Sequence, residues 1–122
     1  MFCKKEGLDE IGIREIDRLT LAATLMGETR GEPYMGKVAV AWVVRNRMAS
    51  PIWWGIFSEL DKRKTGLNPP RYSAEAVCRK PWQFSCWNAN DPSVTVCMKY
   101  ANPDLLQENL KNSQFKDCLR AV

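Results

Sequence analysis

Two carboxylates stand at the end of an apolar helix pattern, in the run GETRGEPY over 27–34. The apolar residues that precede this run recur at helical spacing and predict one buried face; they are Ile13, Ile16, Leu19, Ala22, Ala23 and Met26. Gly31 and Pro33 should end the helix, because glycine tolerates positive φ and proline disfavours helical geometry in the residue before it. Glu28 is therefore expected at the buried end of a helix, where partial removal from water favours a protonated carboxyl. Such a group can act as a general acid.

Glu32 follows Glu28 by four residues, so a continuous helix would place both carboxylates on one face. The predicted helix end argues against that arrangement. Glu32 is better interpreted as a structural group or as a residue at the rim of a cleft. Glu28 itself has a second interpretation, as a surface carboxylate paired with Arg30 or Lys37.

The rest of the chain predicts a mostly α fold (α+β), with the carboxylates held between helices. The expected elements are helices over about 14–30 and 35–49, a short helix or packed turn over 52–57, an exposed loop over 62–71, a helix over 74–79 capped by Ser73, a short strand or extended segment over 82–88, helices after Asp91-Pro92 and Asn102-Pro103, and a last helix capped by Ser113. The last helix is short, so it is expected to bury little of its face. Trp42, Trp53 and Trp54 are expected in the core.

Composition is that of one soluble globular domain over 1–122, with 45% apolar and 26% charged residues. The chain has no apolar run near the ~18 residues of a membrane span, so no stable membrane insertion is expected. A net charge of +4 favours an anionic polymer, such as a cell wall, an acidic membrane surface or nucleic acid, without choosing among them. The basic residues are scattered and form no nucleic-acid-binding motif, which argues against nucleic acid.

The absence of histidine excludes several catalytic classes. Without it the chain cannot form a Ser-His-Asp triad, a Cys-His peptidase pair or a histidine-ligated zinc site. Chemistry must come from carboxylate, lysine, tyrosine or cysteine side chains, and no metal or cofactor is expected. The five cysteines form no CxxC pair and are interpreted mainly as small buried apolar residues. A bridge between two of Cys78, Cys86 and Cys97 is the alternative in an oxidising compartment.

GETRGEPY, followed by GKVAVA over 36–41, VRNR over 44–47 and QFSCWN over 83–88, resembles the SleB-type cell wall hydrolase family. That family includes spore-cortex lytic enzymes and many phage lysins, and the resemblance extends over about 19–119. It implies a lysozyme-like, mostly helical fold and cleavage of the glycan strands of peptidoglycan. For the spore-cortex members it also implies lytic transglycosylase chemistry, with the glutamate that corresponds to Glu28 as the acid.

The resemblance directs attention to residues that could hold a sugar chain beside Glu28. Amide and hydroxyl groups suit sugar hydroxyls, and an aromatic face can stack on a sugar ring. The candidate substrate-binding residues are Glu32, Tyr34, Gln83, Phe84, Ser85, Trp87 and Asn88. Core packing is an equally good interpretation of Phe84 and Trp87. Tyr34 is expected to line the cleft beside Glu28.

The chain departs from the family pattern at its C-terminus. A segment rich in Gly, with Thr, His and Tyr, follows the last helix in that family, whereas this chain ends at Val122. We therefore expect a chain that lacks this segment or a short divergent member. Two alternatives to the lytic transglycosylase stay open, a hydrolytic N-acetylmuramidase with two carboxylates and a non-catalytic peptidoglycan-binding module.

The N-terminus lacks the apolar stretch of a signal peptide. We expect a chain made in the cytoplasm that acts as a monomer on peptidoglycan and reaches the bacterial cell wall by another route. Phage origin fits this expectation, with a membrane-permeabilising partner that releases the chain into the envelope of the host.

Overall fold

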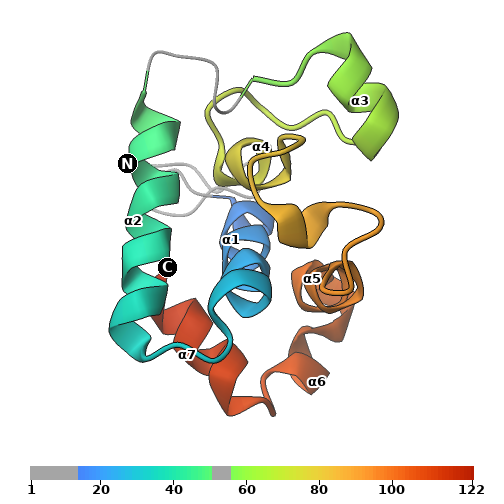
Figure 1. Ribbon diagram of the computed structural model, residues 1–122. Coiled ribbons are helices and arrows are strands. Elements are labelled where there is room, and N and C mark those ends of the chain that lie inside the picture. Colours follow the sequence, from blue (N-terminus) through green and yellow to red (C-terminus); the bar gives the residue numbers. More distant parts are fainter. Residues whose placement is uncertain (1–13, 51–55) are drawn as a thin grey trace.

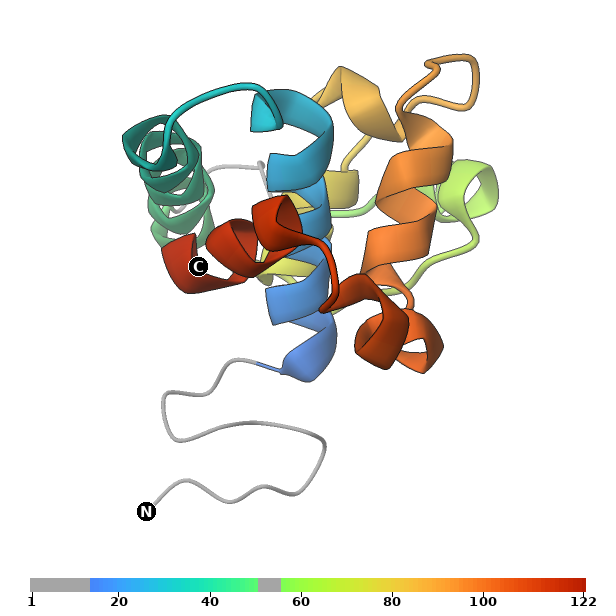
Figure 2. The same ribbon diagram turned by 90° about the horizontal axis from the view of Figure 1, so that it is seen from below.

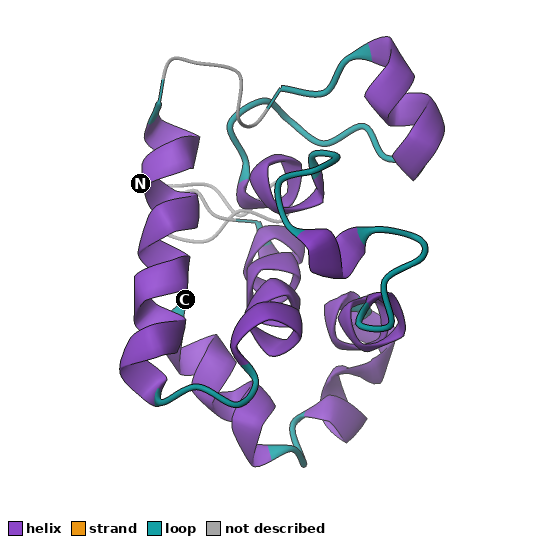
Figure 3. Ribbon diagram, viewed as in Figure 1, coloured by secondary structure: helices purple, strands orange, loops and turns teal. Residues whose placement is uncertain are grey.

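The computed structural model describes residues 14–50 and 56–122. Its helices are α1 (Glu15–Thr29), α2 (Tyr34–Ala49), α3 (Glu59–Thr65), α4 (Ala74–Arg79), η3 (Ser85–Trp87), α5 (Val94–Ala101), η4 (Pro103–Leu105), α6 (Leu106–Asn109) and α7 (Ser113–Ala121). Figure 3 shows these helices joined by loops; the described ranges contain no strand beyond a single bridge residue at Arg14. The predicted mostly helical class is confirmed for this part of the chain. None of its helices is long and apolar enough to cross a membrane.

Helix α1 is the central element of the fold. It lies between α2 and α5, α7 crosses it, and α4 lies near its N-terminal end (Figures 1 and 2). Its buried apolar side chains are Leu19, Leu21, Ala22, Ala23, Leu25 and Met26. They extend beyond the single face predicted from the sequence, because a helix with neighbours on several sides is apolar around most of its circumference. Burial of α1 makes it a fixed support for the residues at its two ends.

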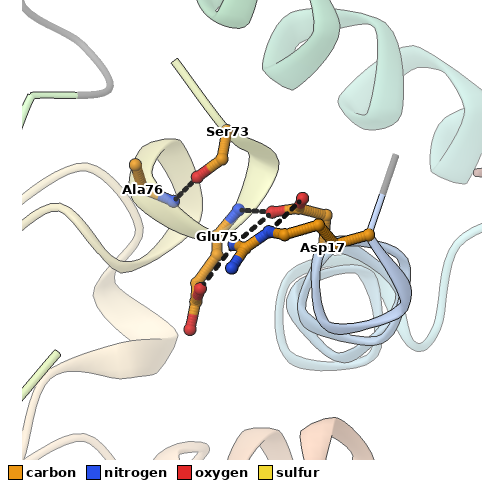
Figure 4. Close-up of polar contacts among 5 residues, drawn as sticks. Asp17, Ser73, Glu75 and Ala76 are labelled. Carbon is orange, nitrogen blue, oxygen red and sulfur yellow. Dashed lines mark hydrogen bonds and ion pairs between the residues drawn. The ribbon is translucent and has the colours of Figure 1, made fainter. Parts of the chain in front are cut away.

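The N-terminal end of α1 is joined to α4 by a partly buried polar network (Figure 4). Arg14 donates from Nε to Asp17 Oδ2 at 3.0 Å and from Nη2 to Glu75 Oε1 at 2.7 Å. Asp17 Oδ1 accepts the main-chain N–H of Glu75 at 2.9 Å. Ser73 caps α4 by accepting the Ala76 N–H at 3.0 Å, which confirms the predicted helix start. The network fixes the angle at which α4 enters the core.

The last helix is more buried than the sequence suggested. Phe115 and Cys118 of α7 are inaccessible to solvent, and the Phe115 ring lies 4.8 Å from that of Tyr100. The cap is Asn112, one residue before the predicted Ser113; its Oδ1 accepts the Phe115 N–H at 3.0 Å. The prediction of a poorly buried helix is wrong, because packing against α1 and α2 supplies the stability that a short isolated helix lacks.

The strand or extended segment predicted over 82–88 is not formed. Residues 81–83 make a turn and Ser85–Trp87 make η3; Phe84 alone between them is extended. The N–H groups of Trp87 and Asn88 bond back to the carbonyls of Phe84 and Ser85, at 3.2 and 2.9 Å. Trp82 has a φ of 71°, which also breaks an extended run. The apolar alternation in QFSCWN reflects a partly buried turn.

Part of the predicted loop over 62–71 is instead the end of α3. Ser58 and Asp61 form a reciprocal capping box at its start, and Gly66 ends it with a φ of 69°. The capping signal was present in the sequence, but α3 has no buried residue and therefore no apolar face to reveal it.

The tryptophans predicted for the core have different outcomes. Trp42 is 53% exposed, and the Arg45 guanidinium lies 5.0 Å from the centre of its ring, so its prediction is wrong. Alanine and valine neighbours on α2 fill the core instead, at Ala41 and Val44. Trp53 and Trp54 lie outside the described residues, as does most of the segment 52–57.

Candidate active site

Glu28 lies in the last turn of α1, which ends at Thr29, one residue before the predicted end at about Arg30. Its side chain is exposed, and so are all four residues of the connection 30–33. The predicted burial of Glu28 is therefore wrong, because the connection does not fold over the helix end. An exposed carboxyl on a fixed helix is accessible to a large ligand from solvent.

Glu32 lies in the connection, beyond the end of α1. Helix α2 begins at Tyr34 with Pro33 as its N-cap residue, so Glu28 and Glu32 do not share a helix. The break predicted from Gly31 and Pro33 is confirmed. The Glu32 side chain is exposed, as expected of a residue at a rim.

The segment QFSCWN packs against the C-terminal half of α1, although the two are about 60 residues apart in sequence. Trp87 donates its indole N–H to Thr24 Oγ1 at 2.8 Å, one helical turn before Glu28. Cys86 is buried, and its thiol lies within hydrogen-bonding reach of Cys97 and of the Glu28 carboxylate. The hydrogen bond with Cys97, burial and Glu28 together raise the pKa of Cys86, so its thiol stays neutral.

Helix α2 contributes to the same region through Arg47. Its Nη1 donates to Gln83 Oε1 at 3.3 Å, and its guanidinium lies 5.5 Å from the centre of the Phe84 ring. Phe84 and Trp87 are both partly buried against the core cluster. Part of each side chain is therefore packed against the core, as one of the two interpretations of these aromatic residues held.

Ser85 and Asn88 lie at the surface end of this segment. Ser85 is exposed and Asn88 is half-buried, and the two are joined by a main-chain hydrogen bond of 2.9 Å. The fold thus gathers Gln83, Phe84, Ser85, Trp87 and Asn88 on one turn against the end of α1.

Tyr34 is directed elsewhere. Its hydroxyl donates to the Arg120 carbonyl of α7 at 3.2 Å, and the Arg120 guanidinium lies 5.2 Å from its ring. Tyr34 therefore ties the start of α2 to α7, a contact that the sequence could not reveal.

Two curated proteins named spore cortex-lytic enzyme are similar to this chain. The one from Bacillus subtilis (strain 168) is 48% identical over 103 residues, covering 76% of this chain and 32% of that protein. The one from Halalkalibacterium halodurans is 50% identical over 103 residues, covering 76% of this chain and 29% of that protein. Over this stretch the chain is similar to spore cortex-lytic enzymes of the SleB type, and residues 19–119, which contain the motifs, are called the SleB-type segment below. It spans about a third of the length of these relatives. No family model and no solved structure matches the chain.

Gly27 is a residue of the SleB-type segment that the sequence interpretation overlooked. A Cβ at this position would lie 2.7 Å from both Cys86 Cβ and Cys97 Sγ, and 2.9 Å from Cys86 Sγ. Only glycine lets η3 and α5 approach α1 this closely. The sequence did contain a signal for this close packing, a glycine inside an apolar helix pattern. Glycine destabilises the interior of a helix, so its presence there usually means that a neighbouring element packs closely.

Lys37 does not form the ion pair with Glu28 that the second interpretation of Glu28 allowed. Its Nζ donates to the main-chain carbonyls of Thr29 and Glu32, at 2.9 and 2.8 Å. A lysine in the first turn of a helix is unfavourable, because the N-terminal end of the helix dipole is also positive. Its presence at that position was the signal in the sequence that Lys37 has a specific role.

Other binding features lie apart from Glu28. Within 14–50 and 56–122, no group of three or more His, Cys, Asp or Glu side chains could hold a metal ion. A cavity of about 570 Å³ is lined by residues from the N-terminal half of α1, α2 and the ends of α4 and α7, including Asp17, Leu21, Trp42 and Arg45. Glu28 and QFSCWN do not line this cavity. The candidate site of this SleB-type segment lies apart from it, at the C-terminal end of α1.

Proposed function

We propose that this SleB-type segment cleaves the glycan strands of peptidoglycan as a lytic transglycosylase, with Glu28 as the catalytic acid and base. The observation that carries the proposal is the position of Glu28, exposed at the end of the central helix beside a turn of polar and aromatic residues. This arrangement suits a long ligand that approaches from solvent. It needs no metal or cofactor.

In this mechanism the Glu28 carboxyl donates its proton to the glycosidic oxygen between N-acetylmuramic acid and N-acetylglucosamine as the C1–O bond breaks. The resulting carboxylate takes the proton of the muramic 6-hydroxyl, whose oxygen bonds to C1. An anhydro sugar and a free N-acetylglucosamine end are formed, and Glu28 is protonated again. A bound glycan would remove water from the exposed carboxyl and supply the dry surroundings that general acid catalysis favours.

The relatives support the substrate class, because both are named for lysis of the spore cortex. Gln83, Ser85 and Asn88 are proposed to bind sugar hydroxyls, and the exposed parts of Phe84 and Trp87 to contact sugar rings. Glu32 is proposed as a rim contact. Tyr34 contributes indirectly, through its bond to α7. We propose action by a monomer at the bacterial cell wall.

A hydrolytic muramidase is the competing chemistry. Its two carboxyl groups lie about 5–5.5 Å apart for retention of configuration and about 6.5–9.5 Å apart for inversion. Glu32 is the nearest second carboxylate along the chain. Lytic cleavage needs Glu28 alone, so Glu32→Gln should cost much less activity than Glu28→Gln, and equal losses would favour the muramidase.

The test is to incubate the chain with purified peptidoglycan and identify the released glycans by mass spectrometry. We expect anhydromuramyl ends, none of them from Glu28→Gln, and an unchanged yield from Glu108→Gln, which alters an exposed carboxylate on α6. Reducing ends that contain an added water would replace the proposal by the muramidase. Binding to peptidoglycan without any release would indicate a non-catalytic binding module.

A further inference from the structure

Lys37 is buried, with 1% of its surface exposed, although it lies in the first turn of α2. Burying an ammonium group is costly unless hydrogen bonds and opposite charge compensate for the lost water. The compensation here comes from main-chain oxygens, since Nζ donates to Thr29 O at 2.9 Å and to Glu32 O at 2.8 Å. Both partners belong to the chain that directly follows Glu28.

The end of α1 explains why a cation is stable there. The last carbonyls of a helix have no partner within the helix, and they form the negative end of its dipole. Helix α1 has no basic residue in its own last turn. Lys37 supplies the missing cation from the next helix, and its ammonium acts as a C-terminal cap of α1.

The same group also sets the shape of the connection. Thr29 O accepts both Lys37 Nζ and the Glu32 N–H, the latter at 2.9 Å. Thr29 is buried, and its hydroxyl donates to Leu25 O at 2.8 Å. Lys37 therefore clamps both ends of a tight turn over 29–32, directly after Glu28.

We infer that Lys37 is a positioning residue for Glu28, because its ammonium fixes the last turn of α1 and the connection from which the acid acts. The inference rests on the proposed function of Glu28. Lys37 is buried beneath the turn and does not touch the glycan. Its loss should lower kcat with little change in KM, because the QFSCWN surface is held separately by Thr24 and Arg47.

The variant Lys37→Met tests this role, because methionine has a similar length and no N–H donors. We expect kcat to fall by about 100-fold, the size of effect that small misplacements of catalytic groups produce. Amide hydrogen exchange over 29–32 should become at least about 10-fold faster, since the turn then opens more readily. Lys37→Arg keeps cationic donors and should restore most of kcat.

Asn109→Leu is the matched control. Asn109 is also 1% exposed, and its Nδ2 donates to the Lys99 carbonyl near the end of α5. It should lower the melting temperature while leaving kcat and the exchange over 29–32 unchanged. If Lys37→Met does not fold, Lys37→Gln, whose side chain is shorter and uncharged, is measured in the same way.

The outcomes separate this inference from the function on which it rests. A kcat within twofold of the parent in Lys37→Met or Lys37→Gln overturns the positioning role, while Glu28→Gln still reports on Glu28. An equal fall in kcat for Asn109→Leu reduces the effect to general destabilisation and also overturns it. Full activity in Glu28→Gln overturns the proposed function itself, and the role of Lys37 with it.

Discussion

The indole N–H of Trp87 bonds to Thr24 Oγ1 at 2.8 Å and joins residues 63 positions apart. Thr24 is inaccessible to solvent, and its hydroxyl donates in turn to the Thr20 carbonyl at 2.7 Å. This chain of hydrogen bonds is a polar link between α1 and the QFSCWN turn. It holds the turn beside Glu28.

The first prediction concerns this link. Thr24→Val leaves the half-buried Trp87 N–H without its acceptor and should lower the free energy of unfolding by about 1–2 kcal/mol. Trp87→Phe should also destabilise the fold. Because the two groups share one hydrogen bond, a double-mutant cycle by urea unfolding should give a coupling of about 0.5–1.5 kcal/mol. Simple additivity would show that the bond contributes nothing to stability.

The second prediction concerns the close packing at Gly27. Alanine normally stabilises a helix relative to glycine by about 1 kcal/mol. At Gly27 its Cβ would lie 2.7 Å from Cys86 and Cys97 atoms, so Gly27→Ala should lower the melting temperature and displace the turn. Gly31→Ala is the control, because a Cβ at that position would have no neighbouring atom within 4 Å. Equal melting temperatures for the two variants would contradict the packing argument.

The third prediction concerns pH and Asp61. Burial raises the pKa of Asp61, but hydrogen bonds from Lys80 and Ser58 outweigh it, so the pKa lies below its ordinary value of 3.8. A carboxyl whose pKa is lower in the folded state stabilises the fold above the unfolded value, and the contribution disappears as pH falls through the folded value. The stability advantage of the parent over Asp61→Asn should therefore be full near pH 6 and shrink below about pH 4.

The measurement for Asp61 is chemical unfolding of both proteins between about pH 2 and pH 7, a range that spans the titration of a carboxyl. Glu108→Gln serves as a control, because the Glu108–Lys111 pair is exposed and such pairs contribute little. An advantage that grows as the pH falls would reverse the assigned sign.

The fourth prediction concerns the buried thiols. Burial raises the pKa of Cys78 to about 12 and that of Cys118 to about 11. The thiolate is the reactive form, so iodoacetamide at about pH 8 should label neither residue in the native chain. Both should react after unfolding, as peptide mass spectrometry would show. Rapid labelling of native Cys78 would mean that the α1–α4 interface opens readily.

The predicted cysteine burial is confirmed for the four described residues, which are all free and buried: Cys78, Cys86, Cys97 and Cys118. Their burial could be predicted from the sequence, because a free cysteine behaves as a small apolar residue. That Cys86 and Cys97 meet at Gly27 was not, because their contact depends on how η3 and α5 pack against α1.

The sequence by itself determined the two long helices, the break between Glu28 and Glu32, and the family resemblance. These features depend on local causes: apolar spacing at about 3.6 residues, the backbone limits of glycine and proline, and a run of motif residues. The side-chain cap at Ser73 was predictable for the same reason.

Tertiary structure alone decided the exposure of Glu28, the packing of QFSCWN against α1, the burial of α7 and the capping of α1 by Lys37. The packing of QFSCWN and of α7 depends on which surfaces meet across long stretches of chain. The Lys37 contact spans only eight residues, but it depends on the path of the chain between two helices. Local propensity encodes neither choice. Lys37 shows the reason most directly. Its charge is tolerated inside the protein because the chain reversal after Glu28 brings the main-chain carbonyls of Thr29 and Glu32 to it.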